Sequence, residues 1–89
     1  MKAIVTVVGM YRVGIIAEIC TTLAALQINI VDISQTVMDH FFTMIMLVDT
    51  SASEKTLDEI RQALQQKETE MGVSIRIQQE DIFQAMHRI

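Results

Sequence analysis

The stretch TVVGMYRVGIIAEICTTL, residues 6–23, decides how this chain folds. Its first part continues a β-branched, apolar run that begins at Ala3 and is typical of a strand. Gly9 interrupts this run, and after Gly14 the apolar residues recur at steps of three and four, which indicates an amphipathic helix. Such a junction is a common place for anions or small ligands, because a helix start offers unpaired backbone N–H groups.

Strand and helix patterns alternate along the rest of the chain. Residues 30–37 and 41–49 read as strands around a corner at Met38-Asp39-His40, and residues 73–79 alternate as a further strand. Two overlapping capping signals, Ser51-x-x-Glu54 and Thr56-x-x-Glu59, predict the start of a second helix that Gly72 ends. The tail EDIFQAMHRI, residues 80–89, predicts a short C-terminal helix.

The element order β-α-β-β-α-β predicts an α+β fold, the ferredoxin-like βαββαβ sandwich. We expect a single domain over residues 1–89, with a four-stranded antiparallel sheet and both helices on one face. The first helix should bury an apolar stripe made of Ile16, Ile19, Cys20, Leu23 and Leu26. The first strand is apolar on both faces and should be central, and the run 41–48 leaves a second apolar face. That second face predicts a homodimer or higher homo-oligomer.

Composition narrows the function classes. The 89 residues are 51% hydrophobic, with a formal net charge of −4, which argues against nucleic-acid binding because a phosphate backbone requires a basic surface. The single cysteine, Cys20, excludes an internal disulfide and favours a cytoplasmic location. No apolar run approaches the length that would span a membrane.

Residues for catalysis or metal binding do not gather in any recognisable pattern, so we expect a protein that is not an enzyme and has no cofactor or metal. Cys20 lies mid-helix and reads as a buried thiol, and His40 reads as a solvated turn residue. An acyl-phosphate hydrolase of this fold would need a glycine-rich phosphate-binding loop with an arginine and an asparagine. Arg12 and Asn29 keep this alternative open, although Gly9 and Gly14 are too few glycines for such a loop.

The chain resembles an ACT domain, on the strength of the element order and of residues 5–34, VTVVGMYRVGIIAEICTTLAALQINIVDIS. The stretches DISQTVM, FFTMIMLVD and IRIQQEDIFQAMHRI make it similar to single-domain proteins related to the glycine cleavage system repressor. This resemblance implies a regulatory module that binds an amino acid or a similar ligand at a dimer interface.

The resemblance also implies a ligand site in the glycine loop and just before the second strand. Carried onto this sequence, the site comprises Gly9, Met10, Tyr11, Arg12, Val13, Gly14, Ile15, Asn29 and Ile30. Tyr11 departs from the family, which usually has Asp or Asn there, and Val13 replaces a frequent proline. The tyrosine removes a group that could hold an ammonium, so it could instead stack on a ligand, plug the pocket or pack in the oligomer.

Simpler roles stay open for the same residues. Gly9 and Gly14 could serve only as a strand end and a helix entry, and Asn29 could be a turn residue with left-handed geometry. The leading hypothesis is a non-enzymatic regulatory module whose dimer binds a small ligand, an amino acid first. The alternative is an oligomerisation or protein-interaction module without a ligand.

Overall fold

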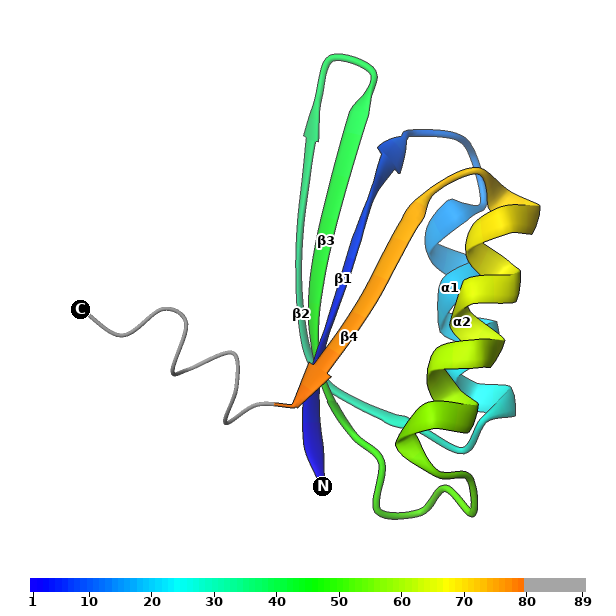
Figure 1. Cartoon of the computed structure of the whole chain (residues 1–89). Helices are drawn as coiled ribbons and strands as arrows, with labels where there is room; N and C mark the ends of the chain where they lie inside the picture. The colour runs from blue at the N-terminus through cyan, green and yellow to red at the C-terminus, as the bar shows by residue number, and fades with distance from the viewer. Residues whose placement is uncertain (80–89) are drawn as a thin grey trace.

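The structure, a computed structural model, describes residues 1–79 and confirms the predicted βαββαβ order (Figure 1). The predicted C-terminal helix over 80–89 lies outside the described residues. The elements are β1 (Lys2–Met10), α1 (Ile15–Ala25), β2 (Asn29–Met38), β3 (Phe41–Asp49), α2 (Leu57–Met71) and β4 (Ser74–Gln79).

The four strands form one antiparallel sheet in the order β2-β3-β1-β4, so β1 is central as predicted and β2 and β4 are the edges. Both helices lie against one face of this sheet, and the opposite face carries no helix of residues 1–79 (Figure 1). The β2–β3 corner is a two-residue turn, Asp39-His40, between the paired residues Met38 and Phe41. Asp39 takes the left-handed conformation with φ +57°, which Asp tolerates better than most residues.

The core lies between the sheet and the helices and follows the two-residue period of the strands. Alternate residues of the central strands are fully buried, among them Val5 and Val7 in β1 and Phe42 and Met44 in β3. The residues between them point to the other face, where Val8 is 44% exposed. The expectation that β1 is covered on both faces therefore holds for only one face within residues 1–79.

Helix α1 is rotated slightly from its predicted orientation. Its fully buried residues are Ile15, Ile19 and Leu23, while Ile16 is only partly buried. Cys20 is also partly exposed, so the prediction of a buried thiol was wrong in degree. The first turn sets which side of α1 faces the core, because Ile15, the first helical residue after Gly14, is buried.

Helix α2 uses the second of the two overlapping capping signals. The Thr56 hydroxyl accepts from the Glu59 backbone N–H at 3.2 Å, and the Glu59 carboxylate accepts from the Thr56 N–H at 2.8 Å. Gly72 ends the helix with φ +69°, as predicted. Ser51 caps no helix. It lies just beyond the end of β3, and its hydroxyl donates to the carboxylate of Asp49, the last residue of β3, at 2.6 Å. Among residues 1–79, neither helix has the length and apolar character to cross a bilayer.

Candidate functional site

The loop between β1 and α1 is the centre of the predicted ligand site, and it is anchored to the β2–β3 turn. The Tyr11 backbone N–H donates to the His40 carbonyl at 2.8 Å. The Tyr11 ring lies against the ring of Phe42, with centroids 6.0 Å apart and planes tilted by 49°. Tyr11 remains 46% exposed, so it packs on Phe42 while much of its surface still faces solvent.

Gly14 sets the start of α1. It adopts φ +86°, a left-handed conformation that L side chains rarely adopt, and an added Cβ would meet nothing within 4 Å. No side chain caps this helix, so backbone N–H groups of its first turn are left for solvent or a ligand. Val13, beside it, is 90% exposed. Gly14 is therefore required for the conformation of the chain, whether or not a ligand binds.

Gly9 has a different role from the one predicted. It lies within β1 and does not end it, because the strand continues through Met10. A Cβ at Gly9 would lie 2.6 Å from the Val73 Cγ1 atom, closer than real Cβ atoms approach. Gly9 thus allows Val73 to pack closely on the sheet just before β4 begins.

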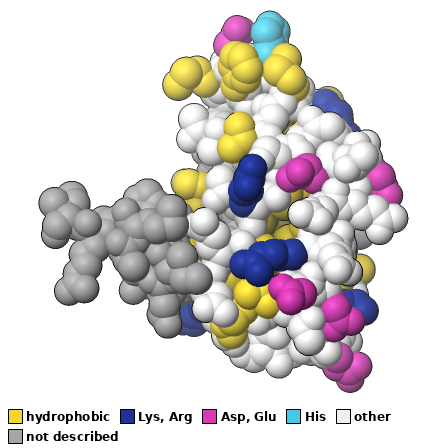
Figure 2. Space-filling model, viewed as in Figure 1, with side chains coloured by type: hydrophobic (Ala, Val, Ile, Leu, Met, Phe, Trp, Pro, Cys, Tyr) yellow, Lys and Arg dark blue, Asp and Glu magenta, His cyan; other side chains and the backbone are white. Residues whose placement is uncertain are grey.

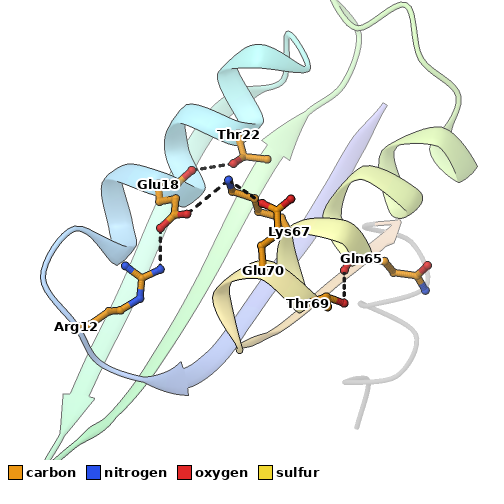
Figure 3. A network of polar contacts seen from close by, with 7 residues as sticks. All are labelled: Arg12, Glu18, Thr22, Gln65, Lys67, Thr69 and Glu70. Carbon is orange, nitrogen blue, oxygen red and sulfur yellow. Dashed lines mark hydrogen bonds and ion pairs between the residues drawn. The ribbon is translucent and has the colours of Figure 1, made fainter.

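Arg12 is the charged side chain of the loop, and it pairs with α1. Its guanidinium donates to Glu18 Oε2 at 2.7 Å, and the other oxygen of Glu18 lies 3.5 Å from Lys67 Nζ on α2 (Figure 3). Lys67 also lies 3.4 Å from the Glu70 carboxylate. The hydrogen bond from Arg12 is the largest effect and lowers the pKa of Glu18, and partial desolvation opposes it. The charge of Arg12 and the hydrogen bond and charge of Lys67 lower this pKa further by smaller amounts. One carboxylate therefore links the loop to both helices.

Asn29 and Ile30 do not lie near this loop in the same chain. Asn29 pairs with Asp49, and Asp49 pairs with Lys2 at the start of β1, whereas the loop follows Met10 at the other end. The two ends of β1 are eight residue steps apart, a span of roughly 26 Å at 3.3 Å per residue. Asn29 is exposed and begins β2, and the left-handed residue after α1 is Gln27, with φ +60°. The structure thus brings Gly9 to Ile15 together and places Asn29 and Ile30 at the far end of the sheet.

A groove between the outer sides of α1 and α2 was not foreseen from the sequence. It has a volume of about 670 Å³. Small residues of α1 line it at every fourth position, namely Ala17, Thr21 and Ala25, and Ala63 of α2 also lines it. This spacing of small residues was the available signal, because small side chains leave space above a helix pair. Glu18, Lys67 and Glu70 also line the groove.

The side chains that could bind a metal or take part in catalysis do not cluster in residues 1–79. Among residues 1–79, no group of three His, Cys, Asp or Glu side chains could hold a metal ion. His40 is exposed in the β2–β3 turn, as predicted, with its Nε2 atom 3.6 Å from Asp39 Oδ1. His87 of the tail lies outside the described residues.

Comparison with known families decides the assignment. The family model for the ACT domain matches residues 2–78. The chain belongs to the ACT domain family. ACT domains are regulatory modules that bind small ligands, and this ACT domain has the four-stranded sheet and two helices of that fold.

Curated relatives match this ACT domain over all or nearly all of their length. A UPF0237 protein of Clostridium acetobutylicum is 52% identical over 89 residues, covering 100% of both chains. A UPF0237 protein of Methanococcus maripaludis is 49% identical over 88 residues, covering 99% of this chain and 98% of the other.

Solved structures support the same assignment. An ACT domain protein from Streptococcus pneumoniae superposes with a TM-score of 0.82 at 41% identity, covering 98% of each chain. A protein assigned as a glycine cleavage system transcriptional repressor shares the fold, with a TM-score of 0.74 at 19% identity over 86% of this chain and 44% of the other. A formyltetrahydrofolate deformylase from Pseudomonas syringae matches with a TM-score of 0.76 at 25% identity. That match covers 88% of this chain and only 27% of the deformylase, which leaves most of the enzyme without a counterpart here.

Proposed function

We propose that this ACT domain is a non-enzymatic cytoplasmic regulator whose dimer binds a small metabolite, with amino acids as the first class to test. The ligand would lie between two copies of the chain. It would contact the glycine loop, residues 9–15, of one copy and Asn29 with Ile30 of the other. Binding would favour one dimer arrangement, and a partner protein would respond to that arrangement.

The observation that carries this proposal is the separation of the two halves of the site. The loop and Asn29 lie at opposite ends of the sheet of one chain, so a single copy cannot bring both to one small ligand. Two identical copies related by a two-fold axis place opposite ends of the same strand side by side. A site shared between copies therefore reunites the two halves without any change in the fold.

The edge strand β2 is the surface through which the two copies would pair. All of its residues except Ile30 are exposed, and one side of its backbone has no neighbouring strand in residues 1–79. Antiparallel pairing of two β2 edges would place Asn29 of a second copy beside Met38. From Met38 the paired row continues through Phe41 to Met10, about 10 Å away at the usual strand spacing. Met38, Phe41 and Met10 belong to the face of the sheet away from the helices, so Asn29 of the second copy would approach the start of the loop from that face.

Apolar exposure also favours an assembly of copies. Val31, Ile33, Val37 and Met38 of β2 are between 42% and 70% exposed. Hydrophobic side chains gather at the end of the molecule that holds the β2–β3 turn (Figure 2). A second copy over β2 would remove this surface from water.

The polar chemistry of the two halves suits a zwitterion. The uncapped first turn of α1 and the Arg12 guanidinium would attract a carboxylate. The Asn29 amide offers both a donor and an acceptor. The glycine loop, residues 9–15, contains no acidic side chain to hold an ammonium group, so Asn29 of the second copy would have to supply that contact.

The alternative is an oligomerisation module without a ligand, and one contact favours it. The Tyr11 ring lies on Phe42 and fills space beside the loop that a ligand could otherwise use. In that case the same β2 pairing would form, and no small molecule would change it.

Sedimentation equilibrium and a thermal-shift screen of the twenty amino acids test the proposal together. We expect twice the 10.1 kDa chain mass at micromolar concentration and a higher Tm with one or a few amino acids. Asn29→Ala should abolish that shift, whereas Asn29→Asp should retain part of it. A dimer with no Tm shift would favour the alternative, and a monomer would contradict both.

A further inference from the structure

We propose that the C-terminal segment, residues 80–89, docks across the uncovered face of its own sheet. The uncovered face is the side opposite α1 and α2, and its central apolar residues are Ile4, Ile45 and Leu47. This contact is independent of the proposed ligand site, since pairing through the β2 edge leaves the uncovered face open.

A hollow marks the place on the uncovered face where a large side chain would fit. It has a volume of about 150 Å³ and is lined by Ile4, Asp32, Ile33, Ser34, Ile45 and Leu47. The β2–β3 pairing shifts register between Ile30 and Asp32, so the bulge in β2 borders the hollow. Ile45 is 40% exposed beside it, as expected for an apolar surface that lacks a cover.

The chain leaves the sheet directly beside this hollow. Gln78 of β4 pairs with Ile4, Ile4 pairs with Leu47, and Leu47 pairs with Asp32, so these four residues form one row across the sheet. β4 ends at Gln79, one residue beyond that row. The segment that follows therefore starts at one end of the row that leads to the hollow.

The length and pattern of the segment match this row. Ten residues of helix extend about 15 Å, and four strands at the usual spacing span about 14 Å. The sequence places Ile82, Phe83, Met86 and Ile89 at helical steps, which gives one apolar stripe. Phe83 is the large side chain of that stripe and is the one we assign to the hollow.

Charges on the uncovered face complement those of the segment. Lys2 and Arg76 lie at the β1–β4 side, and Asp32 lies at the β2 side. Within residues 1–79 none of these three side chains forms an ion pair, and the Asp32 carboxylate accepts only from the Ile33 N–H. The segment begins with Glu80-Asp81 and has Arg88 near its end. Laid along the row, its acids meet Lys2 and Arg76, and Arg88 meets Asp32.

Nuclear Overhauser contacts in the full chain test this docking directly. We expect cross-peaks from the Phe83 ring to the methyl groups of Ile45 and Leu47. An isotope-filtered experiment on mixed labelled and unlabelled chains separates contacts within a chain from those between copies, and we expect only the former. Cross-peaks between copies, cross-peaks to the α1–α2 groove, or none from Phe83 would each overturn the proposal.

Substitutions on the face give a second measurement. Ile45→Asp should remove the cross-peaks and reduce the amide-exchange protection of residues 80–89 to that of an open chain. Val37→Asp is the matched control, because Val37 is 51% exposed on the helix side of β2. Asp32→Lys should weaken protection in the same way, and adding Arg88→Glu should restore it. Equal protection in the wild type and in both face variants would also overturn the docking.

Discussion

The guanidinium of Arg12 lies 2.7 Å from the carboxylate of Glu18, and this pair joins the candidate ligand loop to the first helix. Glu18 also lies 3.5 Å from Lys67, so the same carboxylate joins the loop to α2. A ligand carboxylate at the loop would compete with Glu18 for Arg12. The pair therefore gives the loop a defined charge arrangement before any ligand binds.

The pH dependence of stability tests this pair. The pKa of Glu18 is lowered from its ordinary value of 4.5, chiefly by the hydrogen bond from Arg12. The unfolded chain therefore binds the proton more tightly, so the contribution of Glu18 is present above pH 4.5 and is lost as the pH falls through the folded pKa. Glu18→Gln should make the acid-induced fall in stability less steep, as measured by urea unfolding from about pH 6 to about pH 3. Glu54→Gln is the control, because Glu54 forms no ion pair with another described residue; equal slopes for both variants would show that the pair contributes nothing.

Gly9→Ala tests the close approach of β1 to Val73. The new Cβ would lie 2.6 Å from Val73 Cγ1, so we expect the free energy of unfolding to fall by about 1–3 kcal/mol. Val73→Ala removes that atom, and the double variant should be more stable than the sum of the single effects predicts. Strict additivity in chemical denaturation would contradict the account of Gly9.

Thr56→Ala tests the capping box of α2. Loss of the hydroxyl that accepts from Glu59 N–H should lower the free energy of unfolding by about 1 kcal/mol. Thr69→Ala makes the same chemical change inside the same helix, where Ala is a better helix former, and should cause no comparable loss. If the two variants have the same Tm, Thr56 does not stabilise the start of α2.

Tyr11→Asp tests how Tyr11 affects ligand choice. An aspartate places a carboxylate in the loop where an ammonium group could bind, so we expect a larger amino-acid-induced rise in Tm than in the wild type. The variant should also have a lower Tm without ligand, because it loses the ring contact with Phe42. Tyr11→Phe keeps the ring and is the control, with the ligand response of the wild type. A response to Tyr11→Asp no larger than that of Tyr11→Phe would mean that position 11 does not contact the ligand.

The sequence predicted the elements well because local signals and the global fold agree at most positions. The alternation in 73–79 puts Val73, Ile75 and Ile77 on one face of the strand, and all three are buried. Thr56 and Gly72 marked the ends of α2 through chemistry that acts within a few residues.

The sequence failed where the answer depends on distant contacts. Gly9 looked like a strand end, because nothing in the neighbouring sequence shows that Val73, which is distant in the sequence, packs against it. Ser51 matched a capping signal, but Asp49 and the amino group of Met1, fifty residues away, bind it instead. The separation of Asn29 from Gly14, by contrast, follows from the element order itself, because α1 lies between them and its 11 residues extend about 16 Å.

A mixing experiment tests the shared site most directly. Arg12→Glu damages the loop half of the site, and Asn29→Ala damages the β2 half, so each variant alone should lose the ligand-induced rise in Tm. When the two variants are mixed and allowed to exchange subunits, mixed dimers contain one intact loop facing one intact Asn29. We expect mixing to restore part of the ligand binding measured by calorimetry; no recovery in a sample shown to contain mixed dimers would contradict a site shared between copies.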